Sequence, residues 1–272
     1  MPKCAGTTLN KHFDRVLPDG AFVRPEKFRG LGKHFGRTYD VAALPPLDKA
    51  RLISGHYGCR SIEDLIGERP IRRAILLRDP TSFFLSYYNY RLSRYRSKGQ
   101  GAYTFRTALF SQPRNPQAHF ILKRYLEIPA PKLYLMSDFG KARILSETLS
   151  GFWFVGRYLD CDRLIDAIAD ELGVEGGAER QNTLDQWRRR SSWRATSLEA
   201  LDETDFKLIN RENRLDQWLY DTWAQSGFER RRIAPFTGSA IGRTRSYLRE
   251  LRRPYYQVKR RIGRLVNMSD EG

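Results

Sequence analysis

Short apolar runs alternate with amphipathic stretches along most of this chain. Runs of strand length are predicted at 21–23, 50–56, 72–78, 132–136 and 152–156. Helical spacing of apolar residues is predicted for 7–17, 60–67, 80–95, 102–111, 115–127, 139–149, 160–171 and 197–226. This alternation predicts an α/β fold in which a parallel sheet is covered by helices on both faces.

The first predicted helix begins in a turn that suits an anion. Residues 2–9 have the sequence PKCAGTTL. Gly6 can adopt the backbone angles of a tight turn and lets a ligand approach the main chain. The N–H groups and dipole at the helix start favour a negative charge there, and Lys3 adds a mobile positive charge. An ordinary turn is the alternative, because a Gly-Thr-Thr helix start is common.

This turn differs from the Walker A loop of nucleoside triphosphatases. That motif places its lysine directly after the last glycine, whereas Lys3 precedes Gly6 by three residues. The sequence also lacks an evident strand that ends in a magnesium-binding aspartate. A P-loop kinase therefore remains only the second choice among enzymes.

A second segment places an arginine at the end of a buried strand. The apolar run 74–77 is followed by Arg78, and ligands bind at the C-terminal ends of strands in open α/β sheets. Pro80 can begin the next helix with Asp79 as its N-cap, and Ser86 lies about two turns into that helix. Arg78 and the Ser86 hydroxyl could together bind a phosphate, although a salt-bridged arginine at a strand–helix junction is the alternative.

Together, the two segments resemble the sulfotransferases that use 3′-phosphoadenosine 5′-phosphosulfate, and most closely the carbohydrate 2-O-sulfotransferases and their bacterial relatives. The resemblance rests on Pro-Lys-x-x-Gly-Thr-Thr and on Arg-Asp-Pro followed by Ser-x-Tyr-x-Tyr, and extends from residue 2 to about 228, with 95–130 unmatched. It implies that the 5′ end of the nucleotide contacts Lys3, Ala5, Gly6, Thr7 and Thr8. It likewise assigns the 3′-phosphate to Arg78 and Ser86. Arg180 and Thr183, in a further matching segment, are assigned to the same nucleotide.

Among the four histidines, His56 is the candidate general base. It follows a short apolar run, lies between Gly55 and Gly58, and is predicted at the C-terminal end of a strand. An imidazole titrates near neutral pH and can take the proton of an acceptor hydroxyl. Lys3 would stabilise negative charge on the leaving 5′-phosphate. A structural histidine at a strand–loop junction is the alternative.

We expect no metal, because no His, Cys or carboxylate cluster has ligand spacing. The three cysteines are Cys4, Cys59 and Cys161, an odd and scattered set that indicates a reducing compartment. No run approaches the ~20 apolar residues that span a bilayer, so we expect a cytoplasmic protein.

A phosphate-binding turn normally follows a strand. Because only Met1 and Pro2 precede Lys3, we expect that first strand to be missing from the sequence and encoded upstream.

The chain has 272 residues and a net charge of +17. We predict a sulfotransferase domain over 1–228 and a basic helical extension over 229–272. The extension holds twelve Lys or Arg and four acids, with apolar residues at near-helical spacing and a possible kink at Pro254. It could pack on the domain, contact an anionic membrane surface or attract an acidic polysaccharide acceptor. A nucleic-acid-binding protein is the alternative from another class, although no nucleic-acid-binding motif is present and we expect no such partner.

Overall fold

The structure of the chain is a computed structural model. It describes residues 4–25, 44, 46–56, 58–92, 104–177, 196–225, 227–228, 235–237 and 252–258.

Two short parallel sheets form the β structure of the described residues. In one sheet β1 (Phe22–Val23) pairs with β2 (Leu52–Ile53). In the other, β3 (Ala74–Leu77) pairs with β4 (Phe154–Arg157), and Leu77 lies opposite Arg157. The architecture is thus broadly α/β and mostly helical. The single sheet expected from the sequence is divided here into two, and these strands are shorter than predicted.

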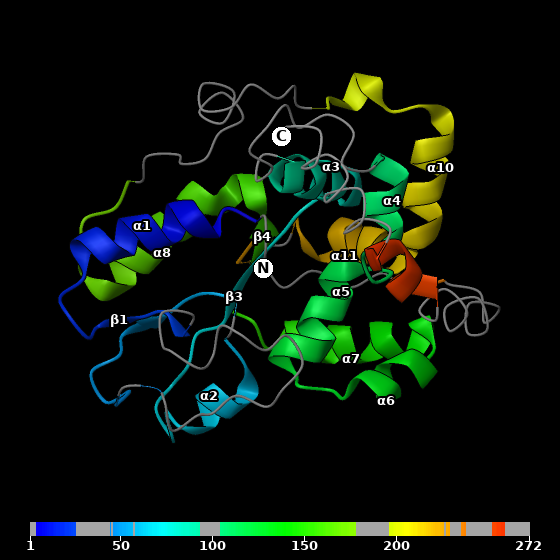
Figure 1. Ribbon diagram of the computed structural model, residues 1–272. Helices are drawn as coiled ribbons and strands as arrows, with labels where there is room; N and C mark the ends of the chain where they lie inside the picture. The colour runs from blue at the N-terminus through cyan, green and yellow to red at the C-terminus, as the bar shows by residue number, and fades with distance from the viewer. Residues whose placement is uncertain are drawn as a thin grey trace, which may run out of the picture.

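Helices account for most of the remaining described structure (Figure 1). Up to residue 125 the helices are α1 (Gly6–Val16), α2 (Arg60–Asp64), α3 (Pro80–Leu92), α4 (Phe105–Phe110), α5 (Pro116–Phe120) and the π-helical turn η3 (Ile121–Tyr125). Those that follow are α6 (Ala130–Leu135), α7 (Asp138–Ser150), η4 (Tyr158–Asp160), α8 (Cys161–Leu172), η5 (Leu198–Ala200), α10 (Glu203–Glu212) and α11 (Arg214–Trp223). The predicted helices at 7–17, 60–67, 139–149 and 160–171 are confirmed.

Helices cover both faces of the β3–β4 sheet. Neighbouring residues of a strand point to opposite faces, so they pack against different helices. Leu76 and Phe154 pack in a buried cluster with residues of α1 and α8. Leu77 and Val155 pack in another cluster with residues of α5, η3, α7 and α11. Figure 1 shows α1 and α8 side by side on one side of the strands and α5, α7 and α11 on the other.

Gly156 makes room for the ring of Phe154 within β4. A Cβ atom on Gly156 would lie 2.4 Å from the Phe154 ring, so no other residue fits there without a rearrangement. The same ring lies 4.6 Å from the ring of Phe228, measured between centroids. The Phe-Val-Gly sequence of this strand is therefore explained by packing alone.

The strand predicted at 132–136 is wrong, because this segment is α6. In a strand Leu133 and Leu135 would share a face, whereas in a helix they lie on opposite sides. Leu133 is 1% exposed and Leu135 is 75% exposed, as the helix requires. Pro129 precedes the helix in an extended conformation and Pro131 lies in its first turn, where prolines are tolerated.

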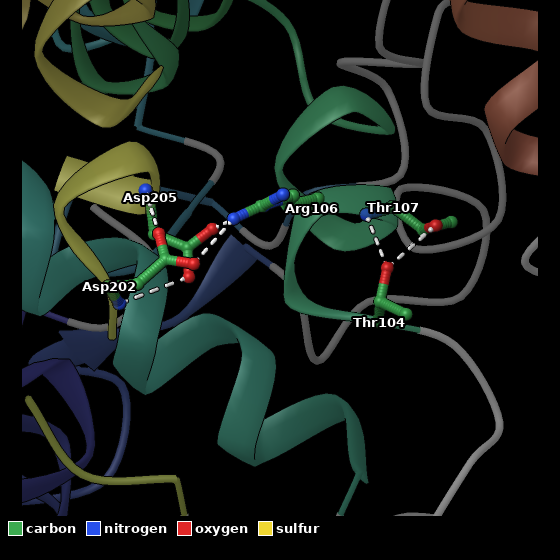
Figure 2. A network of polar contacts seen from close by, with 5 residues as sticks. All are labelled: Thr104, Arg106, Thr107, Asp202 and Asp205. Atoms are coloured by element: carbon green, nitrogen blue, oxygen red, sulfur yellow. Dashed lines mark hydrogen bonds and ion pairs between the residues drawn. The ribbon is translucent and has the colours of Figure 1, made fainter. Parts of the chain in front are cut away.

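An ion-pair network joins α4 to α10 (Figure 2). The Arg106 side chain donates to Asp202 at 2.7 Å and to Asp205 at 2.6 Å. Asp202 also caps α10 by accepting the backbone N–H of Asp205 at 2.7 Å. On the other side of Arg106, Thr104 caps α4 through the N–H of Thr107. The network fixes the start of each helix and the contact between them.

Part of the basic extension is described, and residues 252–258 are helical, as predicted. The Tyr256 ring lies 5.2 Å from the Phe110 ring of α4, so this helix packs on the domain. Pro254 lies within it. No helix among the described residues is long and apolar enough to cross a membrane.

Candidate functional site

The start of α1 is a left-handed turn, and no side chain of the described residues caps the helix that follows. Ala5 has a φ of 57°, and its carbonyl accepts the N–H groups of Thr8 and Leu9 at 3.0 and 3.3 Å. The residue with the unusual backbone angle is therefore Ala5. The sequence had assigned that role to Gly6, which is instead the first helical residue.

Gly6 faces open space. A Cβ atom built there would have no described heavy atom within 4 Å. Thr7 beside it is exposed, whereas Cys4 and Thr8 are buried. No side chain of the described residues caps this helix, and the first N–H groups of a helix have no partner within it. The residues present thus fit an anion at the helix start.

Arg78 follows directly after β3, and its side chain contacts Ser82 and Tyr158. Its Nε donates to Ser82 Oγ at 3.2 Å, and its Cζ lies 4.2 Å from the centroid of the Tyr158 ring. Asp79 accepts the N–H of Ser82 at 2.9 Å, and α3 begins at Pro80. The predicted roles of Asp79 and Pro80 at the helix start are confirmed.

Ser86 lies on α3, one turn beyond Ser82, and is partly buried. Residues four apart share one face of a helix, so the two hydroxyls belong to the same face. The sequence named Ser86 as a further donor to a phosphate held by Arg78, and this stays a prediction. The Ser82 hydroxyl contacts the Arg78 side chain directly.

Tyr158, whose ring lies under Arg78, shares a buried cluster with the start of α1. Tyr158 and Ala5 both pack against the buried cluster that contains Cys4, Leu76 and Cys161. The Sγ of Cys161, at the start of α8, lies 3.9 Å from the carbonyl oxygen of Ala5. The structure thus brings the turn at residues 4–7 and the arginine after β3 to the same region, at the C-terminal ends of β3 and β4.

His56 lies three residues beyond β2 and is exposed. Ser54, just before it, donates to the Asn10 side chain of α1 at 2.8 Å. The His56 ring has its edge against the ring of Phe120, with centroids 6.3 Å apart. Phe120 ends α5, whose Gln117 contacts the backbone of Arg78. Ser54 thus links the segment before His56 to α1, and the His56 ring itself contacts the end of α5.

Three predicted site residues, Lys3, Arg180 and Thr183, lie outside the described residues. His12 is buried on α1, and its Nε2 lies 3.0 Å from the carbonyl oxygen of Glu175. All three cysteines are buried thiols. Burial raises the pKa of Cys59 to about 11, so its thiol stays protonated at neutral pH.

The described part of the chain contains no group of three or more His, Cys, Asp or Glu side chains that could hold a metal ion. A scan against protein-family models finds no matching family, and searches of curated proteins and of solved structures find no match to this chain.

Sequence reasoning missed Tyr158, Ser82 and Gln117. Tyr158 follows β4 directly, as Arg78 follows β3, so the rule that ligands bind at strand ends could have found it. Ser82 lies four residues after Arg78 and could have been found by helical spacing. No local pattern indicates Gln117.

Proposed function

We propose that this chain is a sulfotransferase that moves a sulfuryl group from 3′-phosphoadenosine 5′-phosphosulfate to a hydroxyl of a carbohydrate-type acceptor. The observation that carries the proposal is the position of Tyr158. Its ring lies under the Arg78 guanidinium and packs against the same buried cluster as Ala5. This shared packing supports the proposal that two segments about seventy residues apart in sequence bind one nucleotide with phosphate at both ends.

In this proposal the uncapped start of α1 holds the 5′-phosphosulfate. The N–H groups of Gly6 and Thr7 supply fixed dipoles, and the open space above Gly6 leaves room for the ligand. Lys3 adds a positive charge from the preceding segment. Arg78 holds the 3′-phosphate, with Ser86 and Ser82 on the same side of α3.

His56 is proposed to accept the proton of the acceptor hydroxyl. The bond between the acceptor oxygen and sulfur forms, the bond between sulfur and the bridging oxygen breaks, and the electron pair goes to the 5′-phosphate. As in phosphoryl transfer, positioning and stabilisation of charge supply most of the rate. The net charge of +17 favours acceptors that are themselves acidic.

The experiment that tests this function compares nucleotides as stabilising ligands. Adenosine 3′,5′-bisphosphate should raise the melting temperature of the wild type more than ATP does, because only the former carries a 3′-phosphate. Arg78→Ala should lose that preference. Equal stabilisation by ATP would favour a phosphotransferase, and salt-sensitive DNA binding with no response to either nucleotide would favour a nucleic-acid-binding protein.

Turnover provides the matching catalytic test. With labelled donor and a panel of polysaccharide acceptors, His56→Ala should lose about 100-fold or more in rate, the usual scale of general base catalysis. Its melting temperature should stay close to that of the wild type, because His56 is exposed. A His56→Ala variant with near-normal turnover would contradict the assigned base.

A further inference from the structure

The backbone of Arg78 is held by a side chain from another helix. The Gln117 Oε1 accepts the N–H of Arg78 at 2.9 Å, and the Gln117 Nε2 donates to the carbonyl of Arg78 at 2.6 Å. Both backbone groups of one residue are thus paired with one side-chain amide. A neighbouring strand would pair with the backbone in the same way. Here the Gln117 side chain does so at Arg78, the residue after β3 ends at Leu77.

Gln117 is itself fixed by two helix starts that cap each other. The Asp216 carboxylate on α11 accepts the N–H groups of Gln117 and Ala118 at 2.9 and 2.8 Å. In return, the Asn115 side chain before α5 accepts the N–H groups of Leu215 and Asp216 at 2.9 and 3.2 Å. We call these four bonds the helix clasp. Its members are nearly inaccessible to solvent, since Asn115, Gln117 and Asp216 are 4%, 1% and 1% exposed.

Buried polar groups with this many partners hold one geometry, because any displacement leaves a group unpaired at a cost of about 1–3 kcal/mol. The clasp therefore fixes where α5 begins, and Gln117 transmits that position to the main chain at Arg78. The Arg78 side chain is then oriented by Ser82 and by the Tyr158 ring. Backbone and side chain of the same arginine are constrained from three separate elements, α5, α3 and η4.

We propose that Gln117 is a positioning residue that sets the direction of Arg78 and so determines selectivity for a nucleotide bearing a 3′-phosphate. This inference rests on the proposed function, because it concerns the same nucleotide site. Gln117 acts through the backbone of Arg78 and is not required to touch the ligand. Binding gains from such preorganisation, since less order has to be imposed when the ligand arrives.

The test measures affinity for adenosine 3′,5′-bisphosphate and for 5′-AMP by calorimetry in the full chain. Gln117→Met keeps the volume of the side chain and removes both hydrogen bonds. We expect the affinity for the bisphosphate to fall by about tenfold and that for 5′-AMP to stay unchanged. Hydrogen exchange at the Arg78 amide should become faster, because its acceptor is lost.

Ile209→Val is the matched control. Ile209 is fully buried in the cluster between α3, α4 and α10, and its truncation lowers stability without touching Gln117 or Arg78. It should leave the ratio of the two affinities unchanged. A loss of selectivity in this control comparable to that in Gln117→Met would show a general effect of reduced stability and would overturn the inference.

The outcomes separate the two claims. If Arg78→Ala abolishes selectivity for the 3′-phosphate while Gln117→Met retains it, the positioning role is wrong and the proposed function stands. If the wild type has no selectivity for the bisphosphate over 5′-AMP, the proposed function and this inference both fail.

Discussion

His119 lies in α5 with its ring stacked on Tyr134 of α6. Burial lowers the pKa of His119 to about 3, and the positive charges of Lys123 and Arg253 act in the same direction. An imidazole in this position stays neutral in the folded chain and protonates near pH 6.5 when the chain unfolds. The unfolded state therefore gains protons that the folded state does not bind as the pH falls below about 6.5.

The stability of the chain should consequently decrease as the pH falls from about 6.5 toward 3. Between pH 7 and pH 5 the contribution of His119 amounts to roughly 1–2 kcal/mol of unfolding free energy. His119→Phe keeps an aromatic ring against Tyr134 and removes the titrating group. Urea unfolding of both proteins at pH 5 and pH 7 should give a smaller pH dependence for the variant, and identical dependences would contradict the assignment.

At the same scale, local sequence predicts Arg78, Asp79 and Pro80 correctly in their structural positions, because a strand end, an N-cap and a helix start depend on adjacent residues. The side chains that contact the Arg78 backbone and ring-stack with its guanidinium come from residues distant in sequence. Gln117 and Tyr158 reach it only through the packing of α5 and η4 against the strands. Likewise, the left-handed conformation at Ala5 could not be predicted, because Gly6 is the better residue for it on local grounds.

At the scale of the helices, substitutions of Asn115 in the helix clasp between α5 and α11 separate the contribution of the cap from that of the left-handed backbone. Asn115 has a φ of 47° and also accepts two backbone N–H groups of α11. Asn115→Ala removes the cap and places alanine, which has no polar side chain to stabilise the left-handed conformation, at a positive φ, so it should cost about 2–4 kcal/mol of unfolding free energy. Asn115→Gly removes the cap alone and should cost about 1 kcal/mol less.

Chemical denaturation of the two variants measures that difference. Asn115→Asp is the matched control, because its carboxylate keeps an acceptor for Leu215 and Asp216 and tolerates the left-handed conformation. Equal stabilities of the alanine and glycine variants would mean that backbone strain at Asn115 contributes nothing.

Element type was predictable wherever apolar residues had a clear period, as in α1, α7 and α8. The failure at α6 arose because a short apolar run fits a strand and a helix equally well. The exposure of Leu135 and the prolines at the start of the segment favour the helix. The α4–α10 network of Figure 2 was not predictable, because its partners, Arg106 and the aspartates of α10, are far apart in sequence.

On the scale of the whole molecule, two helical layers enclose the β3–β4 sheet. Ala5 at the start of α1 and Tyr158, whose ring lies under Arg78, pack against one buried cluster beside that sheet. The alternating pattern predicted the α/β class and the layers. It did not predict that β1–β2 and β3–β4 would form separate sheets, because strand pairing is set by tertiary packing.

The central claim is that the start of α1 and Arg78 hold opposite ends of one nucleotide. Calorimetric titration of adenosine 3′,5′-bisphosphate and 5′-AMP into the wild type, Gly6→Val and Arg78→Ala tests it most directly. Gly6→Val fills the open space at the helix start and should weaken both ligands by about tenfold or more, whereas Arg78→Ala should weaken only the bisphosphate, to the level of 5′-AMP. A Gly6→Val variant that binds the bisphosphate as the wild type does would contradict the claim.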